Sequence, residues 1–357
     1  MVSLFITHMQ QVDKDEQSTK APLVLWIAGI LILIFVSVIA AAFIGSVNLF
    51  FIDVFKVIRH HLWGCPLAGV KDSAEFIVWE LRLPRALLAL AVGGGLAVAG
   101  VAMQAVTQNV MAEPYTIGVS SGALLAVTSL SYLGFPHLQN SMAISIAAFC
   151  GALAAMALVY NIGTRGTGRL SNHLILTGMA VSIIFNAASN YFIITMPAES
   201  SIRGVLNWMM GSLSNARWHN IGIPFFGILL STVYFFRHGR DFDTISLGNE
   251  TALSLGVNVV KLRKVSILFI ALITGLTVAC AGIIGLVGFI IPHVLRFISG
   301  ANHQRLLPIS FLCGGLFLIW MDVLARIAVP PQEIPIGIFT ALCGGPVFVS
   351  LLIRKNR

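Results

Sequence analysis

Charged side chains beside apolar segments are the residues of this sequence that could do chemistry. Arg82 and Arg85 flank Pro84 directly before a long apolar run, and Arg326 follows Asp322 by four residues inside another. A guanidinium is a rigid fork that binds carboxylates bidentately. Arginines in this setting also anchor lipid phosphates or cap helix ends. For Arg326, pairing with Asp322 one helical turn away is a serious alternative to any external partner.

Other side chains offer weaker signals. His60 and His61 are adjacent, and His293 follows Pro292. A haem or metal ligand is conceivable, but an adjacent pair in a loop is more often solvated, so we predict no metal site and no cofactor. The five cysteines show no CxxC spacing, which argues against a zinc site or a disulfide framework. Whether these histidines or the methionines Met103, Met111, Met209 and Met210 contact a substrate stays open, with core packing the default for methionine.

Two functional classes lack their signatures. An intramembrane enzyme would place catalytic groups such as an HExxH pair within apolar spans, and this sequence has none. We therefore predict no catalytic residue and no enzymatic activity. A secondary transporter usually needs intramembrane carboxylates for ion coupling, and Asp322 is the only acidic residue well inside a predicted span.

The elements that hold these side chains follow from composition. Hydrophobic residues make up 57% of the 357 residues and charged residues 10%. A soluble domain carries about a quarter charged residues, so this chain lacks the polar surface to face water. One membrane crossing takes roughly 20 apolar residues, which leaves room for about ten helices. We predict an all-α polytopic membrane protein.

The apolar runs divide the chain into a short tail and one membrane domain. Residues 1–21 are polar and form the predicted cytoplasmic N-terminal tail, and residues 22–357 form a single transmembrane domain. The ten predicted spans are 22–44, 83–107, 114–133, 141–162, 173–197, 220–236, 263–282, 284–298, 306–327 and 335–353. Pro292 and Pro335, near helix ends, suggest breaks, which are tolerated at membrane depth only when buried in protein or lining a cavity.

The distribution of basic residues predicts the orientation. With the N-terminus inside, the inner segments hold fourteen of the 22 Lys and Arg residues and the outer segments hold eight. This bias favours cytoplasmic N- and C-termini. It also explains the formal net charge of +8 without a nucleic-acid partner.

The longest polar internal stretch, residues 237–264, faces the cytoplasm in this orientation. Within it, residues 247–257 read LGNETALSLGV, with helix-forming residues around Glu250 and a glycine, Gly256, that could end a short helix. A short amphipathic helix between two spans is well suited to contact a partner at the membrane face.

Several motifs together resemble one family. The segments are RLPR at 82–85, NWMMG at 207–211, LGNETALSLGV at 247–257, GIIGLVGFIIPHVLR at 282–296, NHQRLLP at 302–308, MDVLAR at 321–326 and EIPIG at 333–337, before GGPVF at 344–348. In this order and spacing they resemble the permease subunits of ABC importers for iron–siderophore, haem and cobalamin, the FecCD-like type II importers. The resemblance runs from about residue 25 to residue 353.

The resemblance implies a ten-helix permease that works as a dimer, with a second copy or a paralogue. It implies a separate ATPase in two copies at the cytoplasmic face, and a periplasmic or lipoprotein substrate-binding protein outside. The chain lacks the GxxxxGK[ST] motif that cradles nucleotide phosphates, as a pore subunit would. Membrane lipid surrounds it, and the bacterial inner membrane is the implied location.

The resemblance also assigns roles to residues. The docking residues for the binding protein are Arg82, Arg85 and Arg326, and the residues that contact the ATPase are Leu247, Gly248, Glu250, Ala252, Leu255 and Gly256. Asn109, Met111 and Ser171 match the cytoplasmic gate, although Val110 stands where the family usually has proline. A polar turn capped by Asn109 and Glu113 is the alternative. The implied cargo is a ferric siderophore, with haem, cobalamin or a molybdate-type oxyanion as alternatives.

Overall fold

The structure is a computed structural model, and it describes residues 25–134, 141–164, 170–197 and 199–355. The predicted N-terminal tail, residues 1–21, lies outside the described residues. Within them the elements are helical, apart from one isolated bridge between Val329 and Gln332. The all-α prediction is confirmed.

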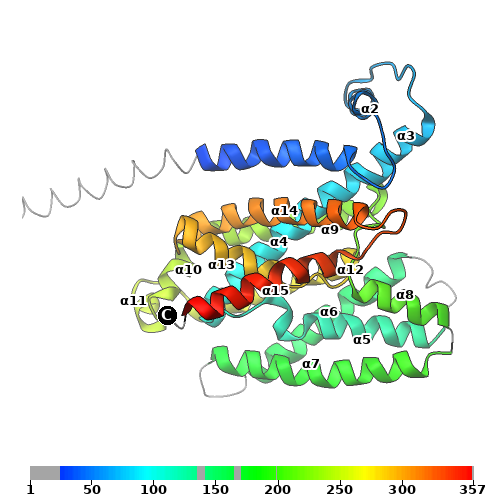
Figure 1. Cartoon of the computed structure of the whole chain (residues 1–357). Helices are drawn as coiled ribbons and strands as arrows, with labels where there is room; N and C mark the ends of the chain where they lie inside the picture. The colour runs from blue at the N-terminus through cyan, green and yellow to red at the C-terminus, as the bar shows by residue number, and fades with distance from the viewer. Residues whose placement is uncertain (1–24, 135–140, 165–169, 198, 356–357) are drawn as a thin grey trace, which may run out of the picture.

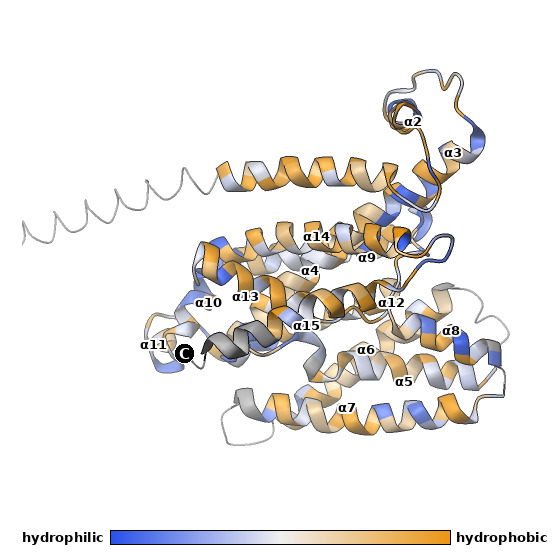
Figure 2. Ribbon diagram, viewed as in Figure 1, coloured by the Kyte–Doolittle hydropathy of each residue, from blue (hydrophilic) through white to orange (hydrophobic). Residues whose placement is uncertain are grey.

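Ten apolar helices correspond one to one with the ten predicted spans. Seven are long enough to cross a membrane: Leu25–Phe43, Asp72–Thr107, Met142–Gly163, His173–Thr195, Trp218–Arg237, Val259–Ala281 and His303–Ile327. The other three, Val119–Tyr132, Val287–Ser299 and Ile336–Phe348, are shorter. Figure 2 shows apolar residues along these helices and polar residues gathered at the two ends of the bundle. This distribution is that of a multi-pass membrane protein.

Figure 1 labels these helices in chain order, apart from the unlabelled N-terminal helix, with further helices between them. The ten apolar helices are the N-terminal helix Leu25–Phe43, α4 (Leu83–Thr107), α5 (Val119–Tyr132), α6 (Ser141–Gly163), α7 (Leu170–Thr195), α9 (Trp218–Arg237), α12 (Val259–Ala281), α13 (Val287–Ser299), α14 (His303–Ile327) and α15 (Ile336–Lys355).

Helix α4 forms the centre of the bundle. It packs against α14, α9, α12 and α13, and nearly all of its residues are buried. Glycines make this packing possible, because a Cβ on Gly100 would overlap the backbone of Gly288 on α13, and a Cβ on Gly93 would overlap the carbonyl of Gly314 on α14. In lipid, where apolar burial between helices gains little, such close backbone contacts drive association.

Two interrupted segments meet inside the bundle. After α4 the chain continues through residues 108–113 into a short 3₁₀ helix, Pro114–Ile117, before α5. The second segment, residues 282–286, separates α12 from α13, and Leu286 there has a positive φ of 71°. The carboxylate of Glu113 accepts a hydrogen bond of 2.6 Å from the Leu286 N–H. The Glu113 side chain therefore accepts the backbone N–H of Leu286 where the helix is interrupted.

The positions of these helix breaks differ from those predicted at Pro292 and Pro335. Pro292 lies inside α13, which continues through it, and the break comes before the helix begins. Pro335 does precede the start of α15 at Ile336. The predicted span 114–133 is a 3₁₀ turn followed, after Gly118 with φ of 85°, by the short helix α5. The glycines, rather than the prolines, mark where the backbone leaves the helix.

The two ends of the bundle carry different short helices (Figure 1). One end holds α10 (Gly239–Ser246) and α11 (Asn249–Ser254), and both the start of the N-terminal helix and the end of α15 lie there. The opposite end holds α2 (Phe51–Trp63), α3 (Asp72–Phe76) and α8 (Glu199–Met209). A π-helical turn, Ile77–Arg82, joins α3 to α4. Residues 45–82, which lie between the first two predicted spans, were expected to form an outer segment without helices, and α2 and α3 lie within them.

Candidate translocation and coupling sites

A buried ion-pair network lies near the start of α4. The Arg85 guanidinium donates through Nε to Asp322 Oδ1 at 2.6 Å and through Nη1 to Glu333 Oε2 at 2.7 Å. Arg326 Nε lies 3.2 Å from the other carboxylate oxygen of Asp322, and its Nη1 donates to the Ala41 carbonyl at 3.0 Å. Asp322 is only 1% exposed. The buried carboxylate of Asp322 on α14 therefore pairs with both arginines, and Glu333 supplies the second negative charge that balances them.

Arg82 is buried in a different way. Its guanidinium donates to the carbonyls of Ala42 at 3.0 Å and Val47 at 2.6 Å, and also to that of Phe43. The N-terminal helix ends at Phe43, so its last carbonyls lack helical partners. Arg82 satisfies them and places positive charge at the negative end of the helix dipole.

These placements bear on the predicted docking arginines. Arg82, Arg85 and Arg326 are 5%, 6% and 3% exposed, and each already has partners within the chain. The pairing of Asp322 with Arg326 is confirmed. Glu333 is the second partner of Arg85, and no role was predicted for it from the sequence. Its signal was the EIPIG motif, an acidic residue in an otherwise apolar stretch.

The predicted ATPase-contacting segment forms the tip of the opposite end. Leu247, Leu253 and Leu255 are each at least 60% exposed, and Glu250 is exposed beside them. Gly248 and Gly256, with φ of 113° and 85°, border α11, which ends before Gly256 as predicted. Ala252 is the exception among the six, because it is fully buried and packs inward. Apolar side chains exposed on short polar helices mark a surface for a protein partner.

Helix α10 holds this tip against the bundle. Phe242 and Ile245 are fully buried, and Asp243 accepts hydrogen bonds from His303 through the backbone N–H at 2.8 Å and the ring Nδ1 at 2.7 Å. On α12, the Arg263 guanidinium donates to the Asn249 amide oxygen at 2.9 Å. The tip is therefore tied to α14 and α12, so a displacement of either α10 or α11 would move spanning helices.

The predicted gate loop lies at the end of α4. Asn109 Oδ1 accepts the Met111 N–H at 2.9 Å in a tight polar turn, and Val110 and Met111 are exposed. The alternative prediction was a polar turn capped by Asn109 and Glu113. Asn109 does cap this turn, whereas Glu113 accepts a hydrogen bond from the Leu286 N–H. Ser171 falls in the first turn of α7, but its side chain lies outside the described residues.

One hydrogen bond connects the gate loop with the tip. Gln108, which ends α4 in a left-handed conformation, donates from Nε2 to the carbonyl of Ile245 on α10 at 3.1 Å. Four residues earlier, Gln104 accepts from Arg296 on α13. The end of α4 is thus bonded both to α10, directly before the segment predicted to meet the ATPase, and to α13, which follows the interrupted segment 282–286. Gln108 begins the segment QNVMAEP at 108–114, which resembles the family's gate loop, but the predicted gate residues were Asn109 and Met111.

A cavity of about 980 Å³ opens between α6, α8, α9 and α12. Its lining combines apolar side chains with polar groups of Asn207, Asn215, His219 and Asn220. Glu333, the partner of Arg85, also contributes to its wall. The cavity therefore adjoins the ion-pair network and leaves room for a sizeable solute.

Interrupted helices beside a cavity and a multi-pass apolar bundle are features of a membrane transport protein. Comparison with known proteins gives the family. A model of the FecCD transport family matches residues 30–354, and the chain belongs to that family. It is an ABC importer permease, a transport subunit rather than an enzyme.

Three relatives illustrate the match. The chain is 35% identical over 295 residues to the vitamin B12 import system permease protein BtuC of Vibrio cholerae, covering 83% of this chain and 88% of that protein. It is 38% identical over 283 residues to the Fe(3+) dicitrate transport system permease protein FecD of Escherichia coli, covering 79% and 86%. A solved inward-facing conformation of a metal-chelate type ABC transporter superposes with a TM-score of 0.79 at 29% identity, covering 92% of this chain and 98% of that one.

Proposed function

We propose that this chain translocates a ferric siderophore across a bacterial inner membrane, using ATP hydrolysed by a separate subunit. The observation that carries the ATP-driven part is the exposed leucine tip of α10 and α11, bonded through Ile245 to Gln108 at the gate loop. A movement imposed on the tip by a partner would pull directly on the end of α4. Such a movement would allow ATP hydrolysis in a separate subunit to drive this permease.

The proposal includes an orientation. The tip faces the cytoplasm, and so do the start of the N-terminal helix and the end of α15, which lie at the same end. The basic residues of the inner segments favour this orientation. The end with α2, α3 and Glu333 then faces outward, where a substrate-binding protein, periplasmic or lipoprotein, delivers its cargo toward the cavity.

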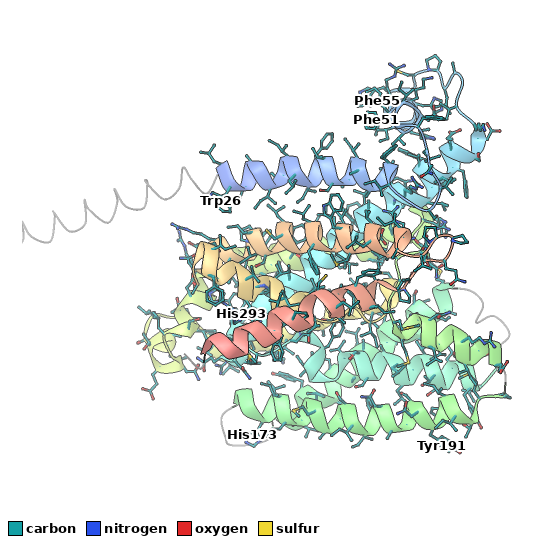
Figure 3. All side chains as sticks on the ribbon, in the orientation of Figure 1. Trp26, Phe51, Phe55, His173, Tyr191 and His293 are labelled. Atoms are coloured by element: carbon teal, nitrogen blue, oxygen red, sulfur yellow. The ribbon has the colours of Figure 1, made fainter. Side chains whose placement is uncertain are left out.

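Two copies of the ATPase and a second permease, identical or paralogous, complete the proposed complex. Support for a permease partner comes from α7, on which Leu176, Ile183, Tyr191 and Ile194 are all more than 60% exposed. Figure 3 shows Tyr191 pointing away from the bundle. Such a face requires lipid or another helix.

Docking of the binding protein near Arg82 and Arg85 is part of the proposal. Because both guanidinium groups are buried, carboxylates of the binding protein would reach Arg85 only in competition with Asp322 and Glu333. They would reach Arg82 only in competition with the backbone carbonyls that it already binds. Glu333 is the weaker competitor, since its side chain is 36% exposed. Arg326 would contribute by holding Asp322 in place.

The choice of cargo rests on relatives. FecD is named for ferric dicitrate and the superposing transporter for a metal chelate, whereas BtuC is named for vitamin B12. We favour a ferric siderophore, with cobalamin, haem and a molybdate-type oxyanion as the alternatives. Binding measurements of the four ligands to the substrate-binding protein that copurifies with this permease would discriminate between them.

The experiment for the coupling tip is a double substitution, Leu253→Asp with Leu255→Asp. Both side chains are exposed, so folding and membrane insertion should be preserved while the ATPase no longer copurifies with the permease. Leu62→Asp is the matched control, because Leu62 is as exposed as Leu253 but lies on α2 at the opposite end. If the double variant retains the ATPase and its substrate-stimulated hydrolysis, the tip is not the coupling surface.

A further inference from the structure

Three potential metal ligands gather at the outer end of the molecule. His60 and His61 lie in the last turn of α2, and Glu75 lies on α3. One ligand atom from each falls within 4.8 Å of the other two. Tetrahedral ligands around zinc, with metal–nitrogen and metal–oxygen bonds near 2.0–2.2 Å, are about 3.3 Å apart. Small side-chain rotations would therefore bring the three donors onto one ion.

The hydrogen bond of His60 prepares one ring for coordination. His60 Nδ1 lies 2.6 Å from the Cys65 carbonyl oxygen. A carbonyl can only accept, so Nδ1 carries the proton and Nε2 is left with its lone pair. A backbone carbonyl that fixes the ring and the tautomer in this way is the usual outer partner of a metal-binding histidine.

The other two donors already face each other. His61 Nε2 donates a hydrogen bond of 2.9 Å to Glu75 Oε1, and a metal ion would displace the shared proton. The two side chains are 26% and 30% exposed. They are accessible to an ion from solution and retain some freedom to adjust. His61 also lies in the last turn of α2, where the negative end of the helix dipole favours a cation.

Aromatic packing connects this cluster to the bundle. The His61 ring stacks on Trp79, with centroids 4.1 Å apart and planes 8° from parallel. Trp79 in turn packs on Trp218 at the start of α9, whose indole N–H donates to the Trp79 carbonyl at 2.7 Å. The neighbouring residues His219 and Asn220 line the cavity. The position of His61 is thus set by a stack that reaches the cavity wall.

The sequence predicted no metal site because His60 and His61 were placed in a loop, whereas they lie on helix α2 beside Glu75. We propose that His60, His61 and Glu75 form a site for a divalent transition-metal ion, with Zn²⁺ as the best-fitting ion. Two imidazoles and one carboxylate are a ligand set that zinc accepts, with a fourth position for water or an incoming donor. The ion would clamp the end of α2 to α3 across the intervening loop. Figure 3 shows Phe51 and Phe55 on the same α2, which projects from the outer end of the bundle.

The test is metal binding to the purified full-length permease without a polyhistidine tag, in lipid nanodiscs. Isothermal titration should give one Zn²⁺ per chain, and Co²⁺ should give the visible absorption of a low-coordinate nitrogen–oxygen site. His60→Ala with His61→Ala should abolish both signals. Glu75→Gln should weaken Zn²⁺ binding by roughly tenfold or more, the loss typical of a disturbed zinc site.

His173→Ala is the matched control, because it removes an exposed histidine from α7, far from α2 (Figure 3). It should leave the stoichiometry and affinity unchanged. Hydrogen exchange provides a second readout: Zn²⁺ should slow exchange across residues 51–82 in the wild-type chain and in the control, but not in the double variant. Binding far below one ion per chain, or binding that persists in the double variant, would overturn the proposal.

Discussion

Replacing Asp322 by asparagine should strongly destabilise the permease. Asp322 forms ion pairs with both Arg85 and Arg326, and it is buried. Removing one partner of a buried ion pair costs about 3–5 kcal/mol. Because Arg85 retains Glu333, we expect about 3 kcal/mol, roughly a hundredfold in the unfolding equilibrium.

The assay is the unfolding transition in detergent micelles, followed by tryptophan fluorescence. Adding Arg326→Gln to Asp322→Asn should recover part of the loss, because the second change removes one of the uncompensated charges. The pair Glu199–Arg203 offers a matched control, since it has the same four-residue spacing but is 85% and 76% exposed. Arg203→Gln should leave stability nearly unchanged. An Asp322→Asn variant as stable as wild type would refute the network as a structural element.

Three further predictions concern the gate, the packing and the orientation. Gln108→Ala should cost only about 0.5–1.5 kcal/mol of stability but reduce transport-stimulated ATP hydrolysis, measured in proteoliposomes; unchanged stimulation would remove its coupling role. Gly100→Leu should lower the yield of folded protein by separating α4 from α13, at a cost of about 1–3 kcal/mol or more, and size-exclusion profiles at wild-type yield would contradict this. In a chain whose five cysteines are replaced by serine, Ser73→Cys should react with impermeant thiol reagents in intact spheroplasts and Arg240→Cys should not; the reverse labelling would invert the orientation.

The helical framework was accessible from the sequence because each span has to bury its own backbone hydrogen bonds in lipid. Apolar runs such as 263–282 therefore mark helices almost directly, and the structure gives Val259–Ala281 there. The helices that were missed, α2, α3, α8 and α10, are short and mixed in polarity. In α2, Val54 and Val57 pack into a small separate core with Val78 of the π-helical turn, a contact that depends on the fold.

The sites were predictable only where the partners are close in sequence. The Asp322–Arg326 pair is one helical turn apart, and it was found. Glu333 and Arg85 are 248 residues apart, so their contact depends on the fold. The resemblance implied that the arginines bind carboxylates of a binding protein, whereas Arg85 and Arg326 pair with carboxylates of this chain.

The most direct test of the central claim is uptake by proteoliposomes that contain this permease, its ATPase and its binding protein. The account predicts that a ferric siderophore accumulates inside only when ATP is present on the side of the α10–α11 tip and the loaded binding protein on the side of α2 and α3. It also predicts that Leu253→Asp with Leu255→Asp abolishes this uptake while Leu62→Asp does not. Uptake that is independent of ATP, or that survives loss of the leucine tip, would contradict it.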